Sequence, residues 1–126
     1  PHDLVAIAQE QEDQTKKFIA QVDSSYLTEE VDMEWSTTTA NLINQTFEDD
    51  EFVNVKVWNV DCRSTLCRVE VEHENQADAA DFHLWASLRL GESLPQTVMQ
   101  YDEGEDGRIV TVVYGIREGY DLPGGE

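Results

Sequence analysis

The chain has 126 residues, enough for a single domain that buries about two thirds of its unfolded surface, so folding requires neither a metal nor a dense disulfide framework. Its 27 acidic and 8 basic side chains give a formal charge of −19, which repels phosphate backbones and anionic lipids. We therefore expect neither nucleic acid nor direct membrane binding, and a sequence that starts at Pro1 without a long apolar run is typical of a mature or trimmed fragment.

The first predicted element is a helix over residues 3–22. Its apolar side chains lie at its two ends, from Leu4 to Ala8 and from Phe18 to Val22, and residues 9–17 between them are polar. Such a helix needs a surface at each end, so it packs by its ends or docks on a second copy. We expect residues 1–25 to form an association element, residues 26–118 to form a single domain and residues 119–126 to form a flexible tail. Deleting residues 1–23 should therefore leave the domain folded.

A second helix is predicted after a break at residues 23–25. Thr28 or Asp32 can cap its first turn with a side-chain oxygen. Apolar and threonine side chains then recur at helical spacing and predict one face directed toward the core: Trp35, Thr39, Leu42, Ile43, Thr46 and Phe47. The acidic run over 48–51 is unfavourable at a helix C-terminus and favours an end there.

Residues 52–62 and 66–74 are predicted to form a β-hairpin. The second strand alternates without error between apolar and charged side chains, which is typical of a half-buried antiparallel strand. The first strand changes parity, so we expect a β-bulge near residues 57–59 that keeps both apolar sets on one face. Pairing of Cys62 with Cys67 further predicts that Trp58 faces Val71.

A third helix is predicted from the cap Asn75 to Leu90, followed by strands over 96–101 and 108–117. The element order is therefore α-α-β-β-α-β-β. This order indicates an α+β fold with a four-stranded antiparallel sheet and helices packed on one face.

Cys62 and Cys67 occupy opposed positions across the hairpin. A four-residue loop separates them, and directly opposed strand residues lie close enough for a disulfide. Their spacing matches neither a zinc ribbon nor a redox C-x-x-C motif. The pattern predicts a structural disulfide whose thiols are unavailable in the native protein.

The segment Val60-Asp-Cys-Arg-Ser-Thr-Leu-Cys-Arg-Val-Glu70 resembles a hairpin, V-x-C-R-x3-C-R-V-E, in uncharacterised secreted or periplasmic bacterial proteins. The resemblance covers residues 35–85 at most. It implies a periplasmic or secreted location, and it implies no catalytic activity.

Two sets of residues are candidates for metal binding, although neither has a complete motif. His73 and His83 lie near Glu72, Glu74 and Asp81, whose carboxylates are ordinary zinc ligands, but burial as structural histidines is the favoured interpretation. Asp102-x-Gly104-x-Asp106-Gly107 matches the start of a calcium loop, yet Val113 stands where the final glutamate belongs, so a hairpin turn is favoured. No cofactor is expected.

These observations leave two functional hypotheses of different classes. The favoured one is an extracytoplasmic domain without catalytic activity that binds a protein partner or forms a homo-oligomer. The alternative is a small metal-assisted hydrolase that uses His73 or His83 with acidic neighbours. A pocket joining the histidines to carboxylates would favour the hydrolase, and an exposed apolar helix stripe would favour association.

The charge itself leads to a first testable prediction. A surface at −19 repels itself, and salt screens this repulsion over about 10 Å at 0.1 M. The melting temperature should therefore rise when sodium chloride is increased from low to moderate concentration. A flat or falling melting temperature would show that the charges are compensated locally.

Overall fold

The structure is a computed structural model that describes residues 4–50, 52 and 54–123. Its elements follow the predicted order, and the α+β class with a four-stranded antiparallel sheet is confirmed. The helices and strands are α1 (Leu4–Thr28), α2 (Met33–Phe47), β1 (Val55–Cys62), β2 (Leu66–His73), α3 (Gln76–Leu90), β3 (Gln96–Glu103) and β4 (Ile109–Ile116).

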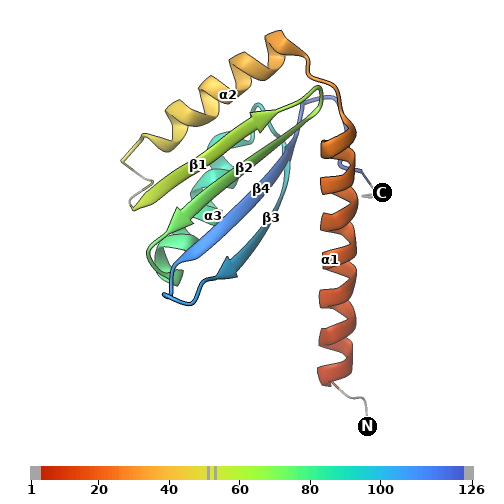
Figure 1. Cartoon of the computed structure of the whole chain (residues 1–126), viewed down its shortest axis with the longest axis vertical. Helices are drawn as coiled ribbons and strands as arrows, with labels where there is room; N and C mark the ends of the chain where they lie inside the picture. Colours follow the sequence, from red (N-terminus) through yellow and green to blue (C-terminus); the bar gives the residue numbers. More distant parts are fainter. Residues whose placement is uncertain (1–3, 51, 53, 124–126) are drawn as a thin grey trace.

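The sheet has the strand order β1-β2-β4-β3, so β1 and β3 are its edges (Figure 1). The predicted bulge is present between Val57 and Asn59 and interrupts the β1–β2 register. Trp58 is the extra residue, so Val57 takes the place opposite Val71 that we had predicted for Trp58. The predicted Trp58–Val71 pairing is therefore wrong, and the Trp58 side chain is 52% exposed.

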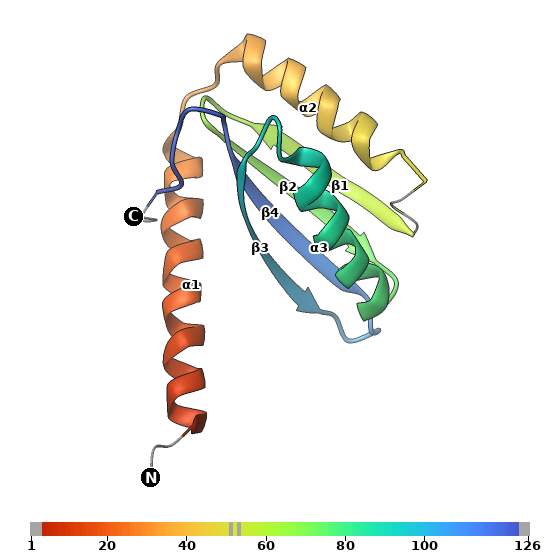
Figure 2. The same ribbon diagram turned by 180° about the vertical axis from the view of Figure 1, so that it is seen from behind.

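One face of the sheet carries α2 and α3, which lie over it in Figure 2. Each helix begins at a predicted cap: Asp32 accepts a hydrogen bond from the Trp35 amide, and Asn75 accepts one from the Asp78 amide. The helices bury apolar side chains against the inward-facing residues of β2 and β4, and Phe82 of α3 contacts both Phe47 and Phe52 in this cluster.

Gly115 of β4 allows the chain to pass closely over the end of this face. Leu94, in the connection between α3 and β3, lies so near that a β-carbon at position 115 would be only 2.8 Å from its Cδ1. A larger residue at position 115 would have to displace Leu94, which is itself buried.

The opposite face carries α1, and this differs from two predictions. Helix α1 continues through the predicted break at residues 23–25 to Thr28, so the predicted domain boundary between residues 25 and 26 falls within it. Helices also lie on both faces rather than one, because Ile19, Val22 and Tyr26 pack against outward-facing residues at one end of the sheet. The partners of this second cluster are Leu66, Tyr114 and Ile116, with Val98 and Val112 beside them.

The amino-terminal half of α1 extends beyond the sheet (Figures 1 and 2). Every residue from 4 to 17 is exposed, whereas the first buried residue of the helix is Ile19. The tail predicted to be flexible also has contacts, since Leu122 packs against the second cluster. Residues 124–126 lie outside the described residues.

Candidate functional site

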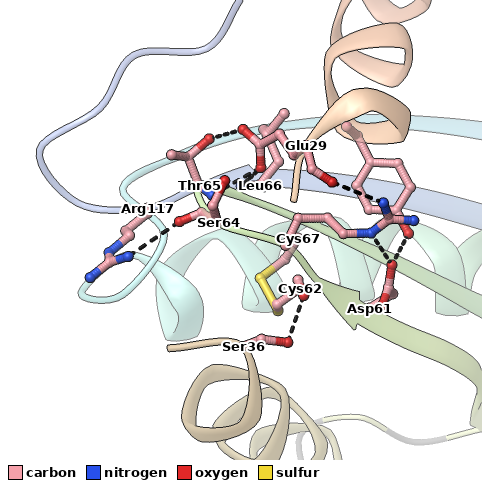
Figure 3. Close-up of a disulfide and its surroundings, with 11 residues drawn as sticks. Glu29, Ser36, Asp61, Cys62, Ser64, Thr65, Leu66, Cys67 and Arg117 are labelled. Carbon is pink, nitrogen blue, oxygen red and sulfur yellow. Dashed lines mark hydrogen bonds and ion pairs between the residues drawn. A yellow bond between two sulfur atoms is a disulfide. The ribbon is translucent and has the colours of Figure 1, made fainter. Parts of the chain in front are cut away.

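Cys62 and Cys67 form the predicted disulfide at the tip of the β1–β2 hairpin (Figure 3). They are directly paired in the register, with their Cα atoms 3.9 Å apart. Both side chains are buried, at 1% and 0% exposure, in the main core cluster. A reagent in solution therefore does not reach either sulfur in the folded protein.

The loop closed by the disulfide is held by residues from three other parts of the chain (Figure 3). After α1, Glu29 accepts hydrogen bonds from the backbone amides of Thr65 and Leu66, at 2.9 and 3.0 Å. Ser36 of α2 donates to the Cys62 carbonyl at 2.6 Å, and the Arg117 amide donates to the Thr65 carbonyl at 2.7 Å. These hydrogen bonds tie the hairpin tip to the segments that follow α1 and β4 and to the first turn of α2.

Tyr26 anchors the carboxyl-terminal half of α1 to β1. Its hydroxyl donates to Asp61, and the guanidinium of Arg63 lies 4.4 Å from the centre of its ring. Burial and the hydrogen bond to Asp61 raise the pKa of Tyr26 to about 12. Burial works to raise the pKa of Asp61 too, but hydrogen bonds from Tyr26 and Arg63 outweigh it and hold this pKa below its ordinary value.

A second polar contact fixes α1 to the centre of the sheet. Tyr114 of β4 donates to Asp23 at 2.5 Å, and Arg68 of β2 lies within 3.7 Å of the same carboxylate. Burial, followed by the hydrogen bond to Asp23, raises the pKa of Tyr114. The carboxyl-terminal half of α1 is therefore part of the fold, and among the described residues of the association element expected over 1–25 only residues 4–17 are exposed without interruption.

His73 and His83 meet at a single threonine under α3. The Thr111 hydroxyl of β4 lies 2.9 Å from His73 Nε2 and 3.3 Å from His83 Nε2. A hydroxyl has one hydrogen, so it donates to one imidazole and accepts from the other. Sequence reasoning missed Thr111 because the larger apolar residues of β4 are Val110, Val112, Tyr114 and Ile116, with Thr111 among the smaller residues between them. The structure instead buries Ile109, Thr111 and Val113 under α3.

The contact between His73 and Thr111 is shielded from solvent. Thr111 and His73 are 0% and 1% exposed, so no substrate reaches the hydroxyl. His73 Nδ1 is buried and has no hydrogen-bond partner among the described residues. Burial, with a smaller contribution from His83, lowers the pKa of His73 to about 4, and burial also lowers the pKa of His83.

The candidate calcium residues belong to the β3–β4 hairpin. Asp102 lies within β3 opposite Val110, whereas Asp106 lies in the turn and accepts a hydrogen bond from the Arg108 amide at 3.1 Å. Gly107 has a φ of 82°, a left-handed conformation that glycine adopts readily. Among the described residues, no three His, Cys, Asp or Glu side chains gather where they could hold a metal ion.

The exposed half of α1 is the remaining candidate. Leu4 is 76% exposed, and Ile7 is 43% exposed one turn later.

Across the described part of the chain, no helix is long and apolar enough to cross a membrane. Comparison with known proteins adds no assignment, because no family model, curated protein or solved structure matches this chain significantly.

Proposed function

We propose that this chain is a protein-interaction domain without catalytic activity, in which the amino-terminal half of α1 docks on another protein. The observation that supports this most directly is the contrast within α1: its carboxyl-terminal half is packed against the sheet, and residues 4–17 extend into solvent. A helical segment as short as residues 4–17 is only marginally stable in water without tertiary contacts, so it gains stability when it contacts a partner.

The anchored half of α1 makes the exposed half a suitable docking element. Asp23 and Tyr26 hold the helix to β4 and β1, and Ile19 and Val22 bury its apolar face. The exposed half therefore continues from a fixed helix, and a partner would bind it with little further ordering of the domain.

We further propose a periplasmic or secreted location. The buried disulfide supports it, since disulfides persist in oxidising compartments and are rare in the cytosol. The resemblance of the hairpin to secreted and periplasmic proteins points the same way.

A surface pocket of about 270 Å³ places Glu72 and Glu74 beside His73, as the alternative hydrolase requires, but the His73 side chain is only 1% exposed. The residue that joins His73 to His83 is Thr111, which is neither a carboxylate nor accessible. The apolar residues Leu4 and Ile7 are exposed on a helix, which is the feature that favours association.

The proposed function is tested by replacing Leu4 and Ile7 with glutamine. Association, measured by light scattering of the purified chain and by quantitative capture from an envelope extract, should weaken about tenfold if roughly 1.4 kcal/mol of apolar burial is lost. The melting temperature should not change, because neither side chain is buried.

A matched control replaces Leu84 and Leu88 with glutamine, since these two leucines are 59% and 65% exposed on α3. It should leave association unchanged. Equal binding by the α1 variant and the wild type would contradict the proposal. Deleting residues 1–14 should likewise preserve folding. Deleting residues 1–23, which we expected from the sequence to leave the domain folded, removes the buried Ile19 and Val22 and should destabilise the domain.

A further inference from the structure

Strand β3 has a free backbone edge. It lies at the end of the sheet and pairs only with β4 among the described strands. In an antiparallel pair, every second residue directs its N–H and C=O groups away from its partner strand. These groups form a template on which another extended chain can pair.

A groove runs along this edge between β3 and α1. Its volume is about 380 Å³, and it is lined on one side by residues of α1 and on the other by residues 99–102 of β3. Helix α1 diverges from β3 toward its amino terminus (Figure 1). The α1 side of the groove is formed by Glu12, Thr15, Lys16 and Ile19.

The two faces of β3 differ in character along this edge. Met99 packs against the main core cluster and Tyr101 against His83 of α3, so both side chains lie on the α3 side of the strand, where Tyr101 is 54% exposed. Asp102 has the alternate parity and lines the groove on the α1 side of the strand. Glu12 and Asp102 supply carboxylates from opposite sides. The Lys16 ammonium lies 3.3 Å from the Glu12 carboxylate, so these two charges offset each other and Asp102 gives the lining its net negative charge.

We propose that this groove binds an extended, cationic segment of a partner protein, which adds a fifth strand to the sheet at β3. This inference rests on the proposed interaction function and names the chemistry of the partner. Main-chain hydrogen bonds to β3 supply affinity in this mode of recognition, and side chains at alternate positions supply specificity. Basic side chains of the segment would face Glu12 and Asp102, and apolar ones would contact Tyr101 and Met99.

Charge favours such a partner over a second copy of this chain. Each copy carries a formal charge of −19, so pairing two β3 edges would bring two strongly acidic chains together. Like charges brought together at an interface oppose association, whereas a cationic segment is attracted to it.

The test uses a synthetic eight-residue peptide of alternating lysine and valine with blocked ends, which matches the length of β3. Binding is followed by the amide NMR signals of the full chain at physiological salt, and the expected result is saturable shifts centred on residues 97–102. A second peptide of the same sequence and charge carries N-methyl groups at alternate backbone positions, which removes the donors needed for strand pairing. This peptide should bind at least about tenfold more weakly, because a strand held at its edge depends on these bonds.

Two variants with the same change of charge locate the site. Asp102→Lys should weaken the unmodified peptide about fivefold by placing a like charge in the groove. Asp81→Lys, at an exposed position of α3, should reduce affinity by less than about twofold through the net charge alone.

Each other outcome overturns the inference. Equal binding of the two peptides, or equal effects of the two variants, would mean that a cationic peptide binds this acidic chain without using the β3 edge. Concentration-dependent shifts at β3 in the free protein would instead identify a second copy as the occupant. The proposed docking by Leu4 and Ile7 is measured separately, so it stands or fails independently of these results.

Discussion

Replacing Cys62 and Cys67 together with alanine should lower the free energy of unfolding by about 2 kcal/mol through loss of the short loop constraint, and by roughly 1 kcal/mol more for each truncated buried side chain. Both cysteines are buried in the main core cluster, so the space they leave cannot be filled by water without further cost.

The same replacement should loosen α1 before it loosens the sheet. The residues that hold the end of α1 lie on or beside the disulfide loop: Asp61 accepts from Tyr26, and the Thr65 and Leu66 amides donate to Glu29. Without the cross-link the loop is freer, so these bonds are made for a smaller fraction of the time. Strands β2 and β4 pair along their whole length and do not depend on the loop.

Denaturant unfolding measures the loss of stability, and amide hydrogen exchange resolves where protection is lost. We expect residues 19–28 to exchange faster in the alanine variant, while the centres of β2 and β4 lose protection only in proportion to the global change. A mass increase of two hydrogens on reduction, with no alkylation of the native protein, would confirm the disulfide itself. Unchanged relative protection of α1 would show that the disulfide acts on the unfolded chain alone.

A single substitution separates the loop contacts from the cross-link. Glu29→Gln removes the charge that accepts from two loop amides and should loosen α1 by about 1 to 2 kcal/mol with the disulfide intact. Glu30→Gln, at the exposed neighbouring position, provides a control with the same chemical change. Equal effects of the two substitutions would assign no role to the Glu29 contacts.

Local patterns in the sequence predicted most of the fold. The caps Asp32 and Asn75 and the bulge near Trp58 each depend on neighbouring residues only, and the structure confirms all three. The opposition of Cys62 and Cys67 also follows from the spacing within one hairpin.

The errors arose where distant residues determine the outcome. Asp23, Ser24 and Ser25 favour a break because they are poor residues for a helix interior, but Asp23 binds Tyr114, 91 positions away, and Tyr26 binds Asp61. Tertiary contacts of this kind outweigh helix propensity. The meeting of His73 and His83 at Thr111 was likewise beyond local patterns, because it depends on how α3 lies over β4.

Acid should destabilise the protein through the buried histidine at the end of β2. The pKa of His73 is about 4 in the folded state against an ordinary value of 6.5, so between these values the unfolded chain binds more protons than the folded one. Stability is therefore fully present above pH 6.5 and falls as the pH is lowered, by about 2 kcal/mol at pH 5 and about 3 kcal/mol at pH 4. His83 adds in the same direction, because its pKa is also lowered by burial.

Other charged groups around His73 set the limits of this effect. Asp78 of α3 and Glu72 of β2 favour the protonated imidazole, and His83 opposes it. Protonation of surface carboxylates near pH 4 also relieves the repulsion of a chain at −19, which works against the loss. A comparison between variants is therefore needed, since the histidine contribution remains after these shared effects cancel.

The decisive variant is His73→Leu, which replaces the imidazole with an apolar side chain that still packs against Phe82 and leaves Thr111 bonded to His83. Between pH 7 and pH 5, the free energy of unfolding of this variant, measured with denaturant, should fall by about 2 kcal/mol less than that of the wild type. His83→Gln provides the comparison at the other histidine and should reduce the loss by less, because His83 is only partly buried. If His73→Leu and the wild type lost the same stability between pH 7 and pH 5, acid would be acting on groups other than this buried imidazole.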